Sequence, residues 1–159
     1  TAPANGICGR SYNLTATGGA SGNAVPFAVT TPAVCTISGN VVSFNVNAGT
    51  CTVTADQAGN SNYNPAPQVN QTFPVRAAAP VITSTTLVAT SATVTGNSGM
   101  PNGTLITINI DGAPTAFTTT VSGGTSSVPM TGLRGGESIS ATAGSGDTRS
   151  ISSIVVIVQ

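Results

Sequence analysis

Residues 42–55 read Val-Ser-Phe-Asn-Val-Asn-Ala-Gly-Thr-Cys-Thr-Val-Thr-Ala, and apolar residues occupy every second position on either side of a turn. Side chains two residues apart in an extended chain lie on the same face. The pattern therefore predicts two neighbouring β-strands joined by the Asn-Ala-Gly-Thr turn. The residues expected on their inner face are Val42, Phe44, Val46, Cys51, Val53 and Ala55.

The same alternation continues on both sides of this segment. Val25, Phe27 and Val29 share one face upstream, and Ser38-Gly39-Asn40 predicts a tight turn before residue 42. Residues 57–67 are rich in Asn, Gly and Pro and predict a long loop, after which Phe73 and Val75 close a first unit. Turn signals recur about every eight to twelve residues, which is typical of a sandwich or barrel of short strands.

A second unit is expected after Arg76-Ala77-Ala78-Ala79-Pro80, because proline disfavours helix in the residue before it. Asp111-Gly112 is a strong signal for a two-residue hairpin turn. The strands expected here lie around residues 87–89, 94, 106–110, 117–121, 128–130, 139–141 and 151–158. We therefore predict two β-sandwich domains, residues 1–77 and 78–159, each small but within the range that folds.

The composition favours an all-β fold and argues against catalysis. Only 5% of the 159 residues are charged, and histidine, lysine and tryptophan are absent. Hydrolases need a base to activate the nucleophile, and glycosidases need two carboxylates that face each other. The carboxylates are Asp56, Asp111, Glu137 and Asp147, which are far apart in sequence. We predict that the chain is not an enzyme and has neither a cofactor nor a metal centre.

The charged residues also limit the partners. The arginines are Arg10, Arg76, Arg134 and Arg149, which are isolated from one another and predict no nucleic-acid surface. No apolar run is long enough for a membrane span. The chain starts at Thr1 without a leader, so we expect either a removed signal peptide or a fragment. A net charge of zero gives little repulsion between copies, which favours association.

Residues 33–40, 42–44, 48–55 and 57–64 resemble bacterial immunoglobulin-like repeats, with cysteine, glycine and tyrosine positions that coincide. Such repeats act as spacers, stalks and adhesin segments in large secreted and surface-anchored proteins. The second unit resembles such a domain only in general character, through residues 103–112. The resemblance implies two tandem immunoglobulin-like β-sandwiches and an extracellular or cell-surface location, and it implies no activity.

The resemblance also suggests a disulfide between Cys35 and Cys51. Each cysteine shares a face with an apolar neighbour, which permits the bond. Two buried free thiols are the alternative, and with three cysteines a pairing of Cys8 with either of the others is also open. We expect Cys35–Cys51, with Cys8 unpaired within the chain and a candidate for an intermolecular contact.

The loop after Asp56 is a candidate for a ligand. Asp56 with Asn60, Asn62 and Asn64 offers oxygen ligands for calcium, but one carboxylate makes a weak site, and a loop capped by Asp and Asn hydrogen bonds is expected instead. A glycan could use Tyr63 and these amides. We expect Tyr63 to lie over a sandwich edge with its hydroxyl hydrogen-bonded.

The C-terminal segment departs from the alternating pattern. Ile154, Val155, Val156, Ile157 and Val158 are apolar on both faces, so they need cover on both sides. Thr1 to Gly9 shows no clear opening strand. Together these features suggest that a terminal segment of one chain completes the sheet of the next, which would build a fibre. In the alternative interpretation, the last strand lies mid-sheet and is covered within the chain.

The sequence therefore predicts a non-catalytic, exported structural protein, a subunit or segment of a surface filament, stalk or appendage. Its partners are expected to be further copies of itself in a homopolymer, with strand complementation as one route, or neighbouring domains of the same protein. A disulfide and packed strands, rather than reactive side chains, would carry this role. An adhesin or glycan-binding module of a larger secreted protein is the first alternative, and a phage virion surface protein is another.

Overall fold

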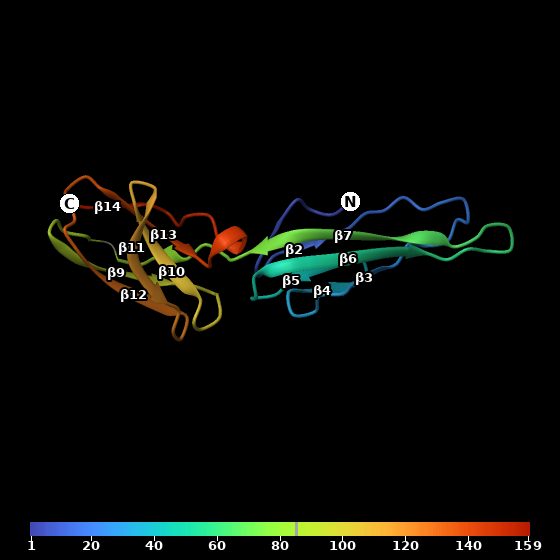
Figure 1. Ribbon diagram of the computed structural model, residues 1–159, viewed down its shortest axis with the longest axis horizontal. Helices are drawn as coiled ribbons and strands as arrows, with labels where there is room; N and C mark the ends of the chain where they lie inside the picture. Colours follow the sequence, from blue (N-terminus) through green and yellow to red (C-terminus); the bar gives the residue numbers. More distant parts are fainter. Residues whose placement is uncertain (85) are drawn as a thin grey trace. The chain divides into compact units, whose positions relative to one another are not determined.

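The computed structural model describes residues 1–84 and 86–159. The chain divides into two compact units, Thr1–Arg76 (unit 1) and Ala77–Gln159 (unit 2), and both consist of β-strands joined by loops (Figure 1). Among the described residues, the only helix is the single 3-10 turn η1, Gly146–Thr148. Within the same residues, no helix is both long and apolar enough to cross a bilayer.

Unit 1 is formed by two sheets. One has the strand order β1-β7-β6-β3 and the other β2-β5-β4. All pairings are antiparallel except that of β1 with β7, which is parallel. The strands are β1 Gly6–Ile7, β2 Ser11–Asn13, β3 Phe27–Val29, β4 Cys35–Ser38, β5 Val41–Phe44, β6 Gly49–Gln57 and β7 Ala66–Arg76.

The core of unit 1 contains a layer in which two cysteines and two phenylalanines meet between the sheets. Cys35 pairs with Phe44 in one sheet, and Cys51 pairs with Phe73 in the other. The two phenylalanine rings meet edge to face, with centroids 5.8 Å apart. A Cβ on Gly6 would lie 2.8 Å from the Phe44 ring, so only glycine lets β1 approach this layer.

Two expectations for unit 1 are wrong. Val46 was expected in the core, but β5 ends at Phe44 and the Val46 side chain is exposed. The N-terminal segment does contain an opening strand, since β1 pairs with Val75 and Arg76 of β7. Sequence alternation could not identify it, because a strand of two residues is too short to show a period.

Unit 2 is also formed by two sheets, with the orders β11-β10-β13-β14 and β12-β9-β8. Their named strand pairings are all antiparallel. The strands are β8 Val81–Ile82, β9 Ser91–Asn97, β10 Leu105–Ile110, β11 Ala113–Thr120, β12 Thr125–Thr131, β13 Ser138–Ala143 and β14 Val156–Ile157.

The central strands β10 and β13 of unit 2 are buried on both faces, so Thr107 and Asn109 are buried together with the predicted core residues. Ile106 and Ile108 of β10 and Ile139 of β13 are buried. Asp111 and Gly112 both have positive φ, 49° and 80°, as a type I′ hairpin turn between β10 and β11 requires. The Asp111 carboxylate also accepts hydrogen bonds from the backbone and hydroxyl of Ser138, which hold the pKa of that carboxyl below its usual range.

The predicted strand at residues 151–158 is wrong in its extent. Only Val156–Ile157 form a strand, β14, and Val158 adds one parallel bridge with Leu87. Residues 150–155 instead follow the edge of β13 without regular pairing. Leu87 was expected in a strand but lies in none; it forms that bridge, and its side chain is fully buried in the core.

Both units have the strand order of immunoglobulin-like sandwiches. If β2 to β7 are named strands B to G, unit 1 has the sheets B-E-D and C-F-G, with β1 added beside strand G. In unit 2, β8, β9 and β10 are named A, B and C, β11 is named C′, and β12, β13 and β14 are named E, F and G. Its sheets are then A-B-E and C′-C-F-G. The predicted all-β, immunoglobulin-like fold is confirmed.

Core packing of unit 2 can be tested at Ile108, which is fully buried. Ile108→Ala should lower the free energy of unfolding of unit 2 by about 2–5 kcal/mol, because it removes buried methyl groups and leaves a cavity. Urea denaturation monitored by hydrogen exchange in peptides from residues 77–159 measures this loss. Val81→Ala, at an exposed position in β8, is the control and should change stability by no more than about 0.5 kcal/mol. Equal losses in the two variants would contradict the assignment.

Candidate functional site

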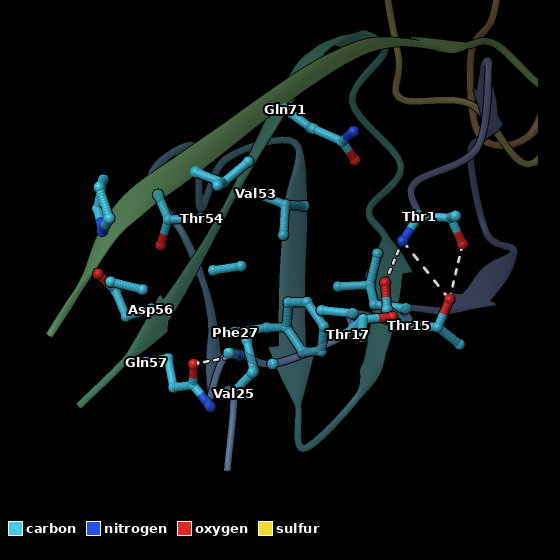
Figure 2. Close-up of a pocket in the computed structure, with 18 residues that line it drawn as sticks. Thr1, Thr15, Thr17, Val25, Phe27, Val53, Thr54, Asp56, Gln57 and Gln71 are labelled. Atoms are coloured by element: carbon cyan, nitrogen blue, oxygen red, sulfur yellow. Dashed lines mark hydrogen bonds between the residues drawn. The ribbon is translucent and has the colours of Figure 1, made fainter. Parts of the chain in front are cut away.

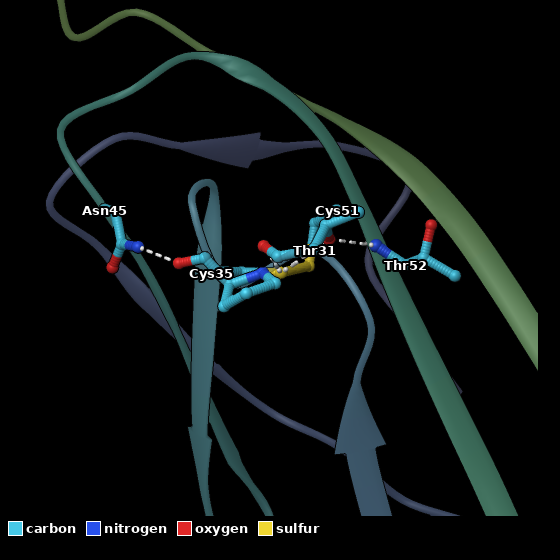
Figure 3. The surroundings of a disulfide bond; sticks show 6 residues. Thr31, Cys35, Asn45, Cys51 and Thr52 are labelled. Atoms are coloured by element: carbon cyan, nitrogen blue, oxygen red, sulfur yellow. Dashed lines mark hydrogen bonds between the residues drawn. A yellow bond between two sulfur atoms is a disulfide. The ribbon is translucent and has the colours of Figure 1, made fainter.

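The disulfide joins the two sheets of unit 1. Cys35 at the start of β4 is bonded to Cys51 of β6, and both residues are fully buried (Figure 3). The backbone carbonyl of Thr31 accepts a hydrogen bond from the Cys35 N–H, and its hydroxyl accepts one from the N–H of Thr52. The pairing suggested by the resemblance is present, and it links strands from opposite sheets.

Cys8 lies in the core of unit 1 and has no disulfide partner. Its backbone N–H donates to the carbonyl of Arg76, which continues the pairing of β1 with β7. Burial raises the pKa of the Cys8 thiol, and a hydrogen bond with its own backbone opposes this in part. Because the thiol is buried and largely protonated, this geometry disfavours Cys8 as a contact between molecules.

An apolar groove opens where the two sheets of unit 1 differ in length. Strands β6 and β7 have 9 and 11 residues, whereas β2, β4 and β5 in the facing sheet have three or four. The far part of the β6–β7 pair is therefore covered by residues 14–25, not by a strand. Between them lies a cavity of about 200 Å³, shown in Figure 2.

The floor of the groove is a row of inward-facing side chains on β3, β6 and β7. Val53 is buried, Phe27 is half-buried, and Val69 is 57% exposed because no strand covers it. Val69 and Gln71 share the face of β7 that carries Phe73 in the core. The groove is thus an open continuation of the hydrophobic core of unit 1.

The opposite wall is held in place by Gln57. Its side-chain oxygen accepts a hydrogen bond from the N–H of Gly19, and its amide donates to the carbonyl of Asn23. A Cβ on Gly18 would lie 2.5 Å from that amide, so a larger residue there would displace the Gln57 side chain. Buried Leu14 anchors the start of the segment. No periodic pattern in the sequence indicated this wall, because residues 14–25 form no strand.

One edge of this sheet lacks a neighbouring strand over much of its length. β1 pairs only with Val75 and Arg76, and among the described residues no strand pairs with the same edge of β7 between residues 66 and 74. Pro67 and Pro74 lie on this strand and have no N–H to donate, as is typical of an edge. The groove is therefore bounded on one side by an unpaired edge.

The loop between β6 and β7 is closed by amide hydrogen bonds, as expected. The side chain of Asn60 accepts from the N–H groups of Asn62 and Tyr63, and that of Asn23 donates to the carbonyls of Ala58 and Gly59. Asp56 does not cap this loop, because its carboxylate accepts two hydrogen bonds from Gln68. Among the described side chains, no group of three His, Cys, Asp or Glu residues is placed to hold a metal ion.

The expectation for Tyr63 is wrong. Its side chain is half exposed, and within the described residues its hydroxyl has no hydrogen-bond partner. The aromatic ring therefore lies at the surface of the loop rather than over a sandwich edge.

Strand β14 is the edge strand of its sheet and pairs with β13, and the residues after it contact residues 87–89. Ile157 and Val156 pair with Ser138 and Ile139 of β13. On the other side, the backbone of Gln159 exchanges hydrogen bonds with Leu87 and Ala89. The backbone around Val158 is thus engaged within the chain. The alternative interpretation is nevertheless wrong in part, because β14 lies at the edge of its sheet and Ile157 is exposed rather than covered.

Two serines hold the segment before β14 against β13. The hydroxyls of Ser150 and Ser153 accept hydrogen bonds from the backbone N–H groups of Ala143 and Ala141. The aliphatic side chains between and after the serines consequently lie at the surface, and Ile154 is 84% exposed. We call this exposed set the ridge; it consists of Ile151, Ile154, Val155 and Ile157. Val158, by contrast, is buried.

Comparison with known proteins gives fold-level similarities only. No family model matches the chain, and no curated protein matches it. Among solved structures, the BSP domain of a biofilm-associated protein is 19% identical, with 98% of this chain covered and a TM-score of 0.42. The chain spans only 28% of that protein's length.

Two further solved structures belong to surface proteins. A segment of intimin is 17% identical, with 98% of this chain and 94% of that chain covered and a TM-score of 0.36. Domains 4 and 5 of the S-layer protein SbsC are 16% identical, with 94% and 78% covered and a TM-score of 0.28. At such scores the similarities do not bear on activity or ligand, and the immunoglobulin-like assignment rests on the strand order described above.

The contribution of the disulfide to stability can be measured directly. Replacing both cysteines, Cys35→Ala with Cys51→Ala, should lower the stability of unit 1 by about 3 kcal/mol, because the bond closes a loop with a sequence separation of 16. Urea denaturation before and after complete reduction is the measurement. Reduction should destabilise the native chain and leave the double variant unchanged. Equal midpoints for the native chain in both states would contradict a stabilising bond.

The reactivity of Cys8 tests its burial. Iodoacetamide at pH 8 should alkylate Cys8 far more slowly in the folded chain than in urea, because burial raises its pKa and limits access. Mass spectrometry of the intact chain follows the reaction. Rapid alkylation without urea, or a dimer linked through Cys8, would show that the thiol is accessible.

Proposed function

We propose that this chain is a non-catalytic structural module of an extracellular surface protein, a subunit or segment of a stalk, filament or appendage. The observation that carries the proposal is the fully buried Cys35–Cys51 disulfide that joins the two sheets of unit 1. Disulfides of this kind form and persist in oxidising compartments outside the cytosol. A small sandwich gains a large part of its net stability from such a bond.

The chemistry of the surface supports the same role. Few side chains are charged, so little of the stability depends on pH or on salt. The groove of unit 1 is lined mainly by aliphatic side chains and threonines, and its one charged side chain, Asp56, is hydrogen-bonded to Gln68. These surfaces are suited to contact with other protein surfaces rather than to acid, base or nucleophilic catalysis.

The location can be tested on cells that produce the protein. Gold-labelled antibodies raised against residues 1–159 should bind intact cells and follow structures that extend from their surface in electron micrographs. The same cells after permeabilisation are the control and should show no additional label. Label that appears only after permeabilisation would contradict the proposal, as would label confined to the cell interior.

A further inference from the structure

The groove of unit 1 and the ridge of unit 2 are both unpartnered in the described chain. The groove leaves Val69 exposed above the apolar floor formed by Val53 and Phe27. The ridge presents four aliphatic side chains on a segment fixed by Ser150 and Ser153. Exposed apolar side chains that gather on one segment, unlike single scattered ones, point to an interaction site. We propose that the ridge of one copy occupies the groove of a second copy.

The electrostatics of the two surfaces favour this occupant. Residues 150–158 carry no charge, and the carboxylate of Asp56 at the groove already accepts two hydrogen bonds. The ridge therefore brings no charge of its own into the groove, where an unpaired charge would be costly. A net charge of zero also leaves no general repulsion between copies. An anionic ligand would find no cationic side chain in the groove.

The size of the groove suits side chains of this kind. Its volume is about 200 Å³. A cavity of about 150 Å³ holds a benzene ring, so the groove has room for one or two branched aliphatic side chains. Ile154 is the most exposed member of the ridge and is therefore the first candidate to enter it. The Ile154 side chain would then cover the floor of the groove, which the short strands of the facing sheet leave uncovered.

The contact needs no strand exchange. Residues 156–159 keep their hydrogen bonds to β13 and to residues 87–89, and only side chains of the ridge enter the groove. Each copy has one groove and one ridge, and the two surfaces differ, so a single contact is heterologous. Where the same two copies do not return the contact, it extends into a chain of copies.

The expected affinity is low for a single contact. Four aliphatic side chains form a smaller patch than the roughly 1,000 Å² that a stable interface requires. We therefore expect dissociation constants between about 1 µM and 1 mM. This inference rests on the proposed structural role, because a weak contact gains strength only where many copies are held close together.

Cross-linking between two different variants tests the contact. Val69→Cys in the groove and Ile154→Cys on the ridge are prepared as separate proteins, each of residues 1–159 with Cys8→Ala, and are mixed under mild oxidation. The mixture should form a disulfide-linked heterodimer at least about tenfold faster than a control mixture of Val46→Cys with Ile154→Cys. Val46 is exposed in the same unit but does not line the groove. Equal rates in the two mixtures would overturn the inference.

Sedimentation velocity provides an independent measurement on the uncross-linked chain. The native chain should show a sedimentation coefficient that rises with concentration, and Ile154→Ser should weaken association about tenfold or more. Val46→Ser removes a comparable exposed aliphatic group and should leave association unchanged. A native chain that stays monomeric to about 1 mM, or an Ile154→Ser variant that associates as strongly as the native chain, would overturn the inference.

The two proposals fail separately. Antibody label on the cell surface together with a monomeric chain would retain the structural role and reject the contact between copies. Tighter binding of an unrelated peptide or a glycan to the groove than of a second copy would also reject the contact, because the groove would then have a different occupant. Titration of the native chain with the peptide or the glycan, with the Val69→Ser variant as the control, distinguishes these outcomes.

Discussion

The structure of unit 1 depends on the layer in which the Cys35–Cys51 disulfide lies beside the Phe44–Phe73 ring contact. The hydrophobic core of a unit of 76 residues is small, and its facing sheet has strands of only three or four residues. The disulfide between the sheets and the two phenylalanine rings packed beside it stabilise unit 1, as a longer hydrophobic core would otherwise have to do. Gly6 belongs to the same arrangement, because a larger residue would push β1 away from the Phe44 ring.

The same layer explains why a groove exists. In this layer, side chains from both sheets fill the core. Strands β6 and β7, however, continue past the end of the facing sheet. The side chains that face inward beyond that end, such as Val69, still follow the alternation of the core. Their cover is a segment without regular structure, held by the hydrogen bonds of Gln57 to Gly19 and Asn23. An irregular segment does not fill space as closely as a strand, so apolar surface stays accessible.

Sequence reasoning succeeded where the physical signal is local. The period of two placed Val42, Phe44, Val53, Ile106 and Ile108 in the cores, and Asp111-Gly112 adopts the hairpin turn that its residue types favour. It failed where the outcome depends on long-range contacts. The strand β1 forms only because β7 is beside it, and Val46 is exposed because its strand ends two residues earlier. The groove could not be predicted, since it results from a difference in length between two sheets.

The C-terminal segment shows how a continuous apolar run can be partly buried without forming one long strand. Serine hydroxyls at positions 150 and 153 take the place of backbone carbonyls as acceptors for β13, so the chain follows the sheet edge without strand geometry. Freed from the alternation of a strand, the isoleucines at 151 and 154 face outward while Val158 enters the core. Exposing large aliphatic side chains has a cost in water. Burial against another apolar surface would remove this cost. The groove of unit 1 is such a surface, and every copy carries one.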